Sequence, residues 1–162
     1  MERLWSPWRM KYILSKKGEG CIFCDKIADN DDQTNYVLYR GEKCYVILNL
    51  YPYNNGHLMV SPYRHVRSPE DLEEDELIEM MLLVNRSLST LRRAMHPDGF
   101  NIGINVGQAA GAGIEGHVHI HVVPRWRADT NFMPIFSHTR VIPELLDETY
   151  RKLKAVWEEP EQ

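Results

Sequence analysis

The segment from His117 to Pro124 reads His-Val-His-Ile-His-Val-Val-Pro, so polar and apolar side chains alternate along it. Successive side chains of a β-strand point to opposite faces, and proline ends a strand, so this pattern predicts a strand over these residues. Three imidazoles, roughly 7 Å apart, then line one face. Val118, Ile120 and Val122 line the other face, which we expect to pack against the core.

Three interpretations of the histidine face stay open. The first is plain polar surface, although histidine has a weaker strand preference than valine and needs partners when it is buried. The second is a metal site, because imidazoles at positions i and i+2 can bind one ion. The third is phosphoryl chemistry, in which a neutral imidazole attacks phosphorus and neighbouring imidazolium groups balance the phosphate oxygens.

The bulk properties of the chain limit its organisation and its partners. With 162 residues, 43% of them hydrophobic, we expect one domain over 1–162. The formal net charge of −4 indicates a surface that does not bind nucleic acid. No run approaches the ~18 apolar residues of a membrane span, and residues 1–20 have the character of an extended arm rather than a secretory signal. A cytoplasmic protein without a membrane partner is therefore expected.

Periodicity predicts the other elements. Short β-rich runs predict strands at 37–40, 44–50 and 57–61, and alternation of apolar and polar residues predicts a strand at 100–106. Apolar residues at three- and four-residue spacing predict a long helix that begins at Ser68-Pro69 and ends near 97–99. The same spacing behind Pro143 predicts a C-terminal helix over 143–158.

A loop rich in glycine and alanine, residues 107–116, precedes the histidine segment. Glycine lets backbone amides approach phosphate oxygens closely, so the loop is a candidate phosphate site. A flexible hairpin connection is the alternative. The loop is not a Walker motif, because no glycine-lysine-serine/threonine sequence follows.

Cys21 and Cys24 are separated by two residues, a spacing that lets both thiolates reach one zinc ion. Three cysteines in a chain of this size do not form a disulfide framework, which favours a reducing compartment. A metal-free pair and a thioredoxin-like redox motif stay as alternatives, although no βαβ pattern surrounds the pair.

Several motifs together resemble the histidine-triad (HIT) superfamily. The histidine segment with Pro124-Arg125-Trp126 behind it is similar to the family signature. Further matching segments fall in the family's order: Cys21–Cys24, Asn49 ahead of Gly56–Val60, and Pro62–Val66. Leu4–Arg9 and Asn131–Pro134 resemble the branch of bacterial diadenosine-tetraphosphate phosphorylases and fragile-histidine-triad hydrolases.

The resemblance implies an α+β fold in which an antiparallel sheet of about five strands is combined with two main helices. It also implies a homodimer that joins the two sheets. In the implied active site, His119 is the nucleophile, His121 donates to phosphate oxygens, and His57 is an orienting partner.

The resemblance also suggests ligands. Asn49 would bind a ribose hydroxyl, and Asn105 lies on the polar face of its predicted strand near the expected phosphates. Gln108, Gly111 and Gly113 are further candidates for nucleotide binding. A structural zinc ion, with no organic cofactor, would be bound by Cys21, Cys24, His65 and His117.

The implied activity is cleavage of a dinucleoside polyphosphate at an α-phosphate through a covalent nucleotidyl-histidine. The acceptor stays open between phosphate and water. Many family members carry a glutamine and then serine or threonine where this chain has Gly113 and Ile114, and this departure leaves room for phosphate as the acceptor. A nucleoside phosphoramidate hydrolase and a nucleotide-binding module with little turnover are the alternative functions.

Overall fold

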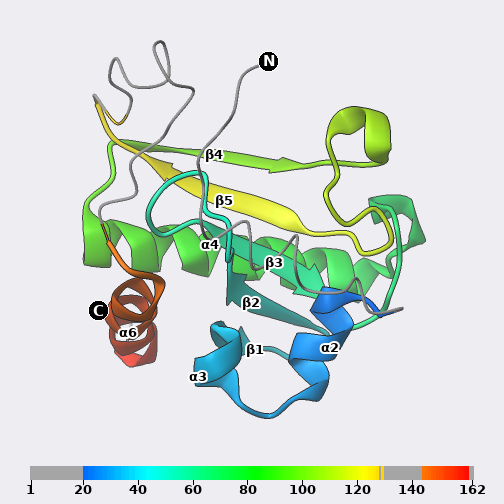
Figure 1. Cartoon of the computed structure of the whole chain (residues 1–162), viewed down its shortest axis with the longest axis horizontal. Coiled ribbons are helices and arrows are strands. Elements are labelled where there is room, and N and C mark those ends of the chain that lie inside the picture. The colour runs from blue at the N-terminus through cyan, green and yellow to red at the C-terminus, as the bar shows by residue number, and fades with distance from the viewer. Residues whose placement is uncertain (1–19, 128, 130–143, 161–162) are drawn as a thin grey trace, which may run out of the picture.

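A computed structural model of the chain describes residues 20–127, 129 and 144–160. Within these residues, five strands form one antiparallel sheet in the order β1-β2-β3-β5-β4 (Figure 1). The strands are β1 (Val37–Arg40), β2 (Cys44–Leu48), β3 (Leu58–Pro62), β4 (Gly99–Ile104) and β5 (Ile120–Arg125). The predicted α+β fold is confirmed. The N-terminal arm and Asn131–Pro134 lie outside the described residues.

Strand β2, which lies between β1 and β3, is buried on both faces of the sheet. Cys44, Val46 and Leu48 point into the larger hydrophobic cluster, which also contains helix residues. Tyr45 and Ile47 point into a second cluster on the opposite face. This alternation divides the molecule into a helix-covered side and a side where the smaller cluster lies.

Two helices supply the layer of the larger cluster that packs against the strands. Helix α4 (Glu74–Met95) runs across one face of the sheet, and α6 (Leu146–Glu158) lies at one end of it (Figure 1). Their buried contributions include Met80, Val84, Leu91, Leu153 and Trp157. The predicted helix 143–158 is present from residue 146, and Pro143 lies outside the described residues. Among the described helices, none is long and apolar enough to cross a membrane.

Helix α4 begins later than predicted. Ser68-Pro69 opens a separate 3-10 turn, Pro69–Asp71, and the Ser68 hydroxyl donates to Glu70 instead of capping a helix. The cap of α4 is Glu73, which forms a reciprocal capping box with Glu76. The proline therefore belongs to a turn ahead of the helix, and the side chains of Glu73 and Glu76 accept hydrogen bonds from backbone amides at the start of the helix itself.

Two short helices were not predicted. Helices α2 (Ile22–Ala28), which contains Cys24, and α3 (Asp32–Asn35) lie between Cys21 and β1. Both are shorter than the window in which helical periodicity can be recognised. The buried residue of α2 is Phe23, which joins the smaller cluster and so attaches this helix to the sheet.

The histidine strand is shorter than predicted. Its pairing with both neighbouring strands ends at Ile120, so the predicted strand over 117–124 starts three residues late. Ahead of it, the backbone amide of Val118 donates to the carbonyl of Val66 at 2.7 Å, and its carbonyl accepts from the Ser61 hydroxyl at 3.0 Å. The loop after β3 therefore holds the first two histidines outside the regular ladder.

Candidate active site and metal centre

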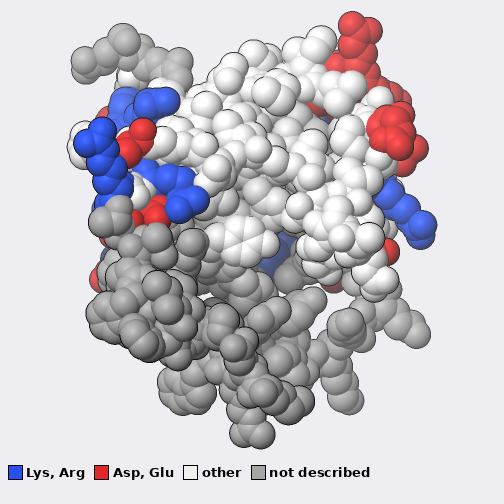
Figure 2. Space-filling model, turned by 90° about the horizontal axis from the view of Figure 1, so that it is seen from above, with Lys and Arg blue, Asp and Glu red and all other residues white. Residues whose placement is uncertain are grey.

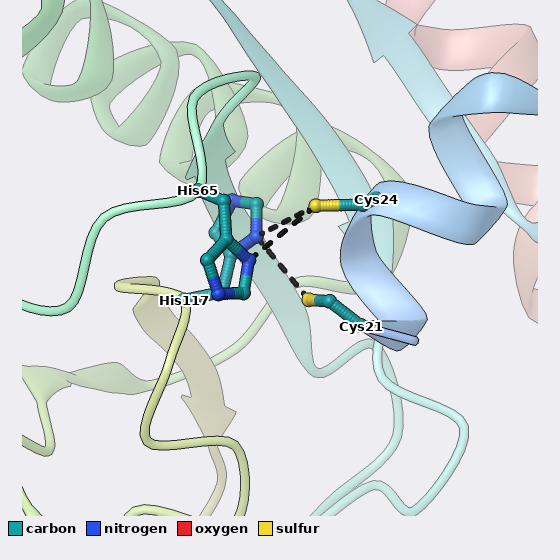
Figure 3. Close-up of side chains that lie close together, drawn as sticks. All are labelled: Cys21, Cys24, His65 and His117. Carbon is teal, nitrogen blue, oxygen red and sulfur yellow. Dashed lines mark hydrogen bonds between the residues drawn. The ribbon is translucent and has the colours of Figure 1, made fainter. Parts of the chain in front are cut away.

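Segments far apart in the sequence bring two cysteines and two histidines together (Figure 3). Cys21 is the N-cap of α2, and Cys24 lies in its first turn. His65 is in the loop after β3, and His117 precedes β5. Their ligand atoms all lie within 4.8 Å of one another. The structure thus gathers all four predicted zinc ligands at one point.

The spacing of these atoms suits a zinc ion. Nδ1 of His117 lies 3.4 Å from Sγ of Cys21 and 3.5 Å from Sγ of Cys24, and Nδ1 of His65 lies 3.5 Å from Sγ of Cys24. Tetrahedral zinc with bonds of about 2.3 Å to sulfur and about 2.05 Å to nitrogen separates these atoms by roughly 3.6 Å. The donor set and the distances therefore both fit zinc.

Hydrogen bonding orients His117 for this role. Its Nε2 lies 2.8 Å from the carbonyl oxygen of Pro62, which can only accept, so Nε2 carries the proton. The lone pair is then on Nδ1, directed at the two sulfur atoms. Burial lowers the pKa of His117, which favours this neutral form. Burial and the charge of Cys21 raise the pKa of Cys24 to about 11, so its thiolate form requires a cation nearby.

The same reasoning fixes the tautomer of His119. Its Nδ1 lies 2.8 Å from the backbone carbonyl of His117 and must donate the proton. Nε2 therefore carries the lone pair. The side chain is 6% exposed, and burial lowers its pKa, so the imidazole is neutral at neutral pH. A neutral ring with a lone pair at a defined atom is the form that a nucleophile needs.

A chain of hydrogen bonds determines the tautomers of the other two imidazoles, those of His57 and His121. The backbone N–H of Tyr53 donates to Nδ1 of His57 at 3.1 Å, so Nε2 of His57 carries a proton. That nitrogen lies 2.9 Å from Nδ1 of His121 and donates to it. In neutral His121 the proton is consequently on Nε2. His121 can therefore donate a hydrogen bond to an oxygen of a bound phosphate.

The imidazoles of His57 and His121 are both neutral at neutral pH. The expectation that imidazolium groups neighbour the nucleophile is therefore wrong. Burial, with a smaller contribution from the charges of His121 and His119, lowers the pKa of His57 to about 3. Burial and the charge of His119 lower the pKa of His121 to about 4. The ring of His121 stands edge-on to that of His119 with centroids 4.7 Å apart. Two charged rings at this distance in a buried site would repel each other.

Asn49 lies beside this chain. Its Oδ1 accepts from the backbone N–H of Tyr51 at 2.8 Å, and its Nδ2 lies 3.3 Å from Nδ1 of His57. The structure thus places Asn49 in contact with His57, the predicted orienting partner. Its contact with a ribose hydroxyl stays a prediction.

The loop candidates lie on open surface. Gln108 is exposed and begins a short 3-10 turn, and Gly111 has a φ of 85°, which favours glycine. A side chain built at Gly111 or Gly113 would meet no atom within 4 Å. Asn105 is partly exposed at the end of β4. Phosphate binding by these four residues stays a prediction.

Two residues of the site were missed at the level of the sequence. Phe23 packs its ring against His119, with centroids 4.7 Å apart. Tyr53 is 52% exposed, and its ring lies 4.8 Å from that of His57. The only feature of the sequence that could have indicated Phe23 is its position between the candidate ligands Cys21 and Cys24. No feature of the sequence distinguished Tyr53 from the other residues of its loop.

Comparisons with known proteins agree with this geometry. A family model described as the HIT domain matches residues 30–128. The AP-4-A phosphorylase of Mycobacterium tuberculosis strain H37Rv is 40% identical over 166 residues, covering 97% of this chain and 85% of the relative.

Solved structures share the fold as well. A zinc-bound histidine triad family protein from Mycobacterium smegmatis has a TM-score of 0.69 at 30% identity, covering 85% of this chain and 93% of that one. A hypothetical histidine triad nucleotide-binding protein from Sulfolobus tokodaii has a TM-score of 0.67 at 31% identity, covering 85% and 89%. With this sheet, this histidine arrangement and these matches, the chain belongs to the HIT family.

The buried neutral histidines make folding stability depend on pH. The unfolded state of His57 takes up a proton below a pKa near 6.5, whereas the folded state does so only near 3. The unfolded chain therefore binds more protons as pH falls, and stability is lost below pH 6.5. Chemical denaturation measures the free energy of unfolding at pH 6 and at pH 5. Between these two pH values, the variant His57→Gln should lose about 1 kcal/mol less of this free energy than the wild-type protein. Equal losses in the two proteins would contradict a neutral, buried His57.

Proposed function

We propose that this chain cleaves dinucleoside polyphosphates, transferring a nucleoside monophosphate first to His119 and then to inorganic phosphate. The observation that carries the proposal is the Nε2 lone pair of His119, fixed by the hydrogen bond from its Nδ1 to the carbonyl of His117. The similarity over 97% of the chain to a protein named AP-4-A phosphorylase supports this choice of substrate class and acceptor.

In the first step, Nε2 of His119 attacks the α-phosphorus. A phosphorus–nitrogen bond forms, and the bond from that phosphorus to the bridging oxygen breaks, releasing the remaining nucleoside polyphosphate. The ring becomes positively charged, and its Nδ1–H shares this charge with the carbonyl oxygen of His117. His121 donates from Nε2 to a phosphate oxygen as charge shifts there. Positioning and fixed hydrogen-bond donors supply the catalysis.

In the second step, an oxygen of inorganic phosphate attacks the phosphorus of the nucleotidyl-histidine. The electron pair of the phosphorus–nitrogen bond returns to Nε2, and a nucleoside diphosphate leaves. Water in the same place would release a nucleoside monophosphate. The open space around Gly113, where a side chain would meet no atom within 4 Å, supports entry of the larger acceptor.

The acceptor determines the products from diadenosine tetraphosphate. With inorganic phosphate present, we expect ADP and ATP, because phosphate opens the intermediate. Without phosphate, turnover should fall by at least about tenfold, since only water remains. Mass spectrometry of the products measures both cases, and AMP with ATP regardless of phosphate would show a hydrolase instead.

The assigned nucleophile is tested by His119→Asn, which should reduce turnover by at least about 10³-fold. His96→Asn is the matched control, because His96 is exposed in a left-handed conformation that asparagine tolerates. Retained turnover in His119→Asn would contradict the mechanism, as would an equal loss in the control.

We propose that the cysteine and histidine cluster holds a structural zinc ion. The fit of the four ligand atoms supports this, together with the zinc-bound relative from Mycobacterium smegmatis. Four protein ligands close the coordination sphere, so the ion would stabilise the fold and orient His117 rather than contact substrate.

Elemental analysis should find about one zinc per chain. Cys24→Ser should lower this below half and reduce the melting temperature, since metal binding stabilises the folded state. Cys44→Ala is the control, because Cys44 is buried in the larger hydrophobic cluster away from the metal ligands, and it should keep its zinc. Metal-free wild-type protein, or equal zinc loss in the control, would contradict the site.

We also propose that two copies pair along β4. Among the described strands, β4 is an edge of the sheet, and Ile102, Ile104 and Val106 are exposed on or beside it. Arg92 of α4 lies over the ring of Phe100, so one side of the helix faces this strand. The exposed apolar residues of α4 are Leu77, Ile78, Met81 and Leu82. Figure 2 shows this face of the molecule, with most charged side chains at its two ends and mostly uncharged surface between them.

A second copy fits this surface, because an unpaired edge strand with apolar neighbours favours pairing with its own kind. Sedimentation should give twice the mass of the chain, and Ile104→Glu should give the monomer mass. Leu145→Glu is the control, since Leu145 is exposed outside this surface. A monomeric wild-type protein would contradict the pairing.

A further inference from the structure

The helix that carries the two cysteines also carries a buried aromatic ring. Phe23 stands between Cys21 and Cys24 in the sequence and is 2% exposed. The two cysteines are directed at His65 and His117 (Figure 3). Phe23 contributes to the smaller hydrophobic cluster of the sheet.

The ring of Phe23 contacts the imidazoles of His117 and His119. Its centroid lies 4.7 Å from that of His119, at an interplanar angle of 40°, and 5.3 Å from that of His117, at 47°. The ring of His121 lies 4.7 Å from that of His119 at 75°. His119 is thus packed between one aromatic ring from α2 and one imidazole from β5, the strand that follows it.

The hydrogen bond of His119 leaves one side-chain torsion, the rotation of its imidazole ring, that packing can restrict. The bond from Nδ1 to the carbonyl of His117 fixes the tautomer and one point of the ring. Rotation of the ring about its attachment is a broad, two-fold torsion, which a single bond restrains weakly. Contact with Phe23 restricts this torsion and so fixes the direction of the Nε2 lone pair.

His117 supplies a second connection between the cluster and the nucleophile. Its imidazole is one of the four candidate metal ligands, while its backbone carbonyl accepts from His119. Anything that holds His117 and α2 in place therefore acts on His119 through both the carbonyl and Phe23.

We propose that Phe23 is a positioning residue for His119, and that the metal cluster keeps it there by fixing α2 against the histidine segment. The proposal rests on the proposed function for its kinetic readout. In-line attack needs the lone pair aligned with phosphorus, and small misplacements of reacting groups reduce rates strongly. Substrate binding depends less on the direction of the His119 ring than the attack does. Loss of the Phe23 contact should therefore lower kcat and leave KM nearly unchanged.

The experiment compares Phe23→Ala with Phe23→Leu, which keeps most of the apolar volume. Val37→Ala is the matched control, because Val37 is fully buried in the same cluster and has no ring to pack on an imidazole. Each protein is assayed for kcat and KM with diadenosine tetraphosphate and phosphate, for bound zinc, and for the ring signals of His119 in ¹H–¹⁵N spectra.

For Phe23→Ala we expect kcat lower by about 10- to 100-fold, KM within about threefold, and zinc retained. The His119 ring signals should broaden, and Phe23→Leu should lie between this variant and wild type. Val37→Ala should keep kcat within about twofold. Removing zinc from the wild-type protein with a chelator should broaden the same ring signals.

Unchanged kcat and ring signals in Phe23→Ala would overturn the positioning role. A raised KM at constant kcat would also overturn it, because Phe23 would then contact the nucleotide. Unchanged signals after confirmed zinc loss would overturn the role of the metal cluster. If Phe23→Ala does not fold, Phe23→Leu decides by the same criteria. If wild-type protein does not turn over the substrate, the proposed function fails, while the ring signals still test the positioning of His119.

Discussion

The hydrogen bond from Nδ1 of His119 to the carbonyl oxygen of His117 determines which nitrogen of the central imidazole can react. A backbone carbonyl has no proton to give, so the bond leaves the lone pair on Nε2 in every neutral state of the ring. The carbonyl occupies its position because the backbone at Val118 is bonded to the neighbouring loop. The chemistry of the site thus follows from backbone geometry as much as from the histidines.

Burial completes this arrangement by keeping the imidazoles uncharged. The rings of His57, His119 and His121 lie where desolvation lowers every pKa, so each nitrogen is a donor or an acceptor according to its neighbour. The order runs from the backbone N–H of Tyr53 through His57 to His121. A neutral nucleophile then stands beside a neutral donor, and charge develops only when phosphate is bound.

Regular patterns in the sequence predicted individual strands, while the resemblance to the histidine-triad family implied the sheet and most residues gathered in the site. A β-rich run identified the strand near β2, and alternation identified the strand near β4. The spacing of Cys21 and Cys24 and the resemblance, which added His65 and His117, gave the four candidate metal ligands that the structure brings together. The sequence did not show that the histidine strand begins at Ile120, because backbone bonds to a distant loop end the ladder there. It also missed α2 and the contact of Phe23, since a seven-residue helix leaves no clear period and its packing partner is 96 residues away from it along the chain.

The central claim is that Nε2 of His119 forms a covalent bond to the α-phosphorus. Rapid quenching of the wild-type protein with diadenosine tetraphosphate, in the absence of phosphate, followed by peptide mass spectrometry, tests it directly. The account predicts one adenylyl group attached to His119 during turnover. Turnover with no labelled histidine at any quench time, or a label on His57 or His121 instead, would contradict it.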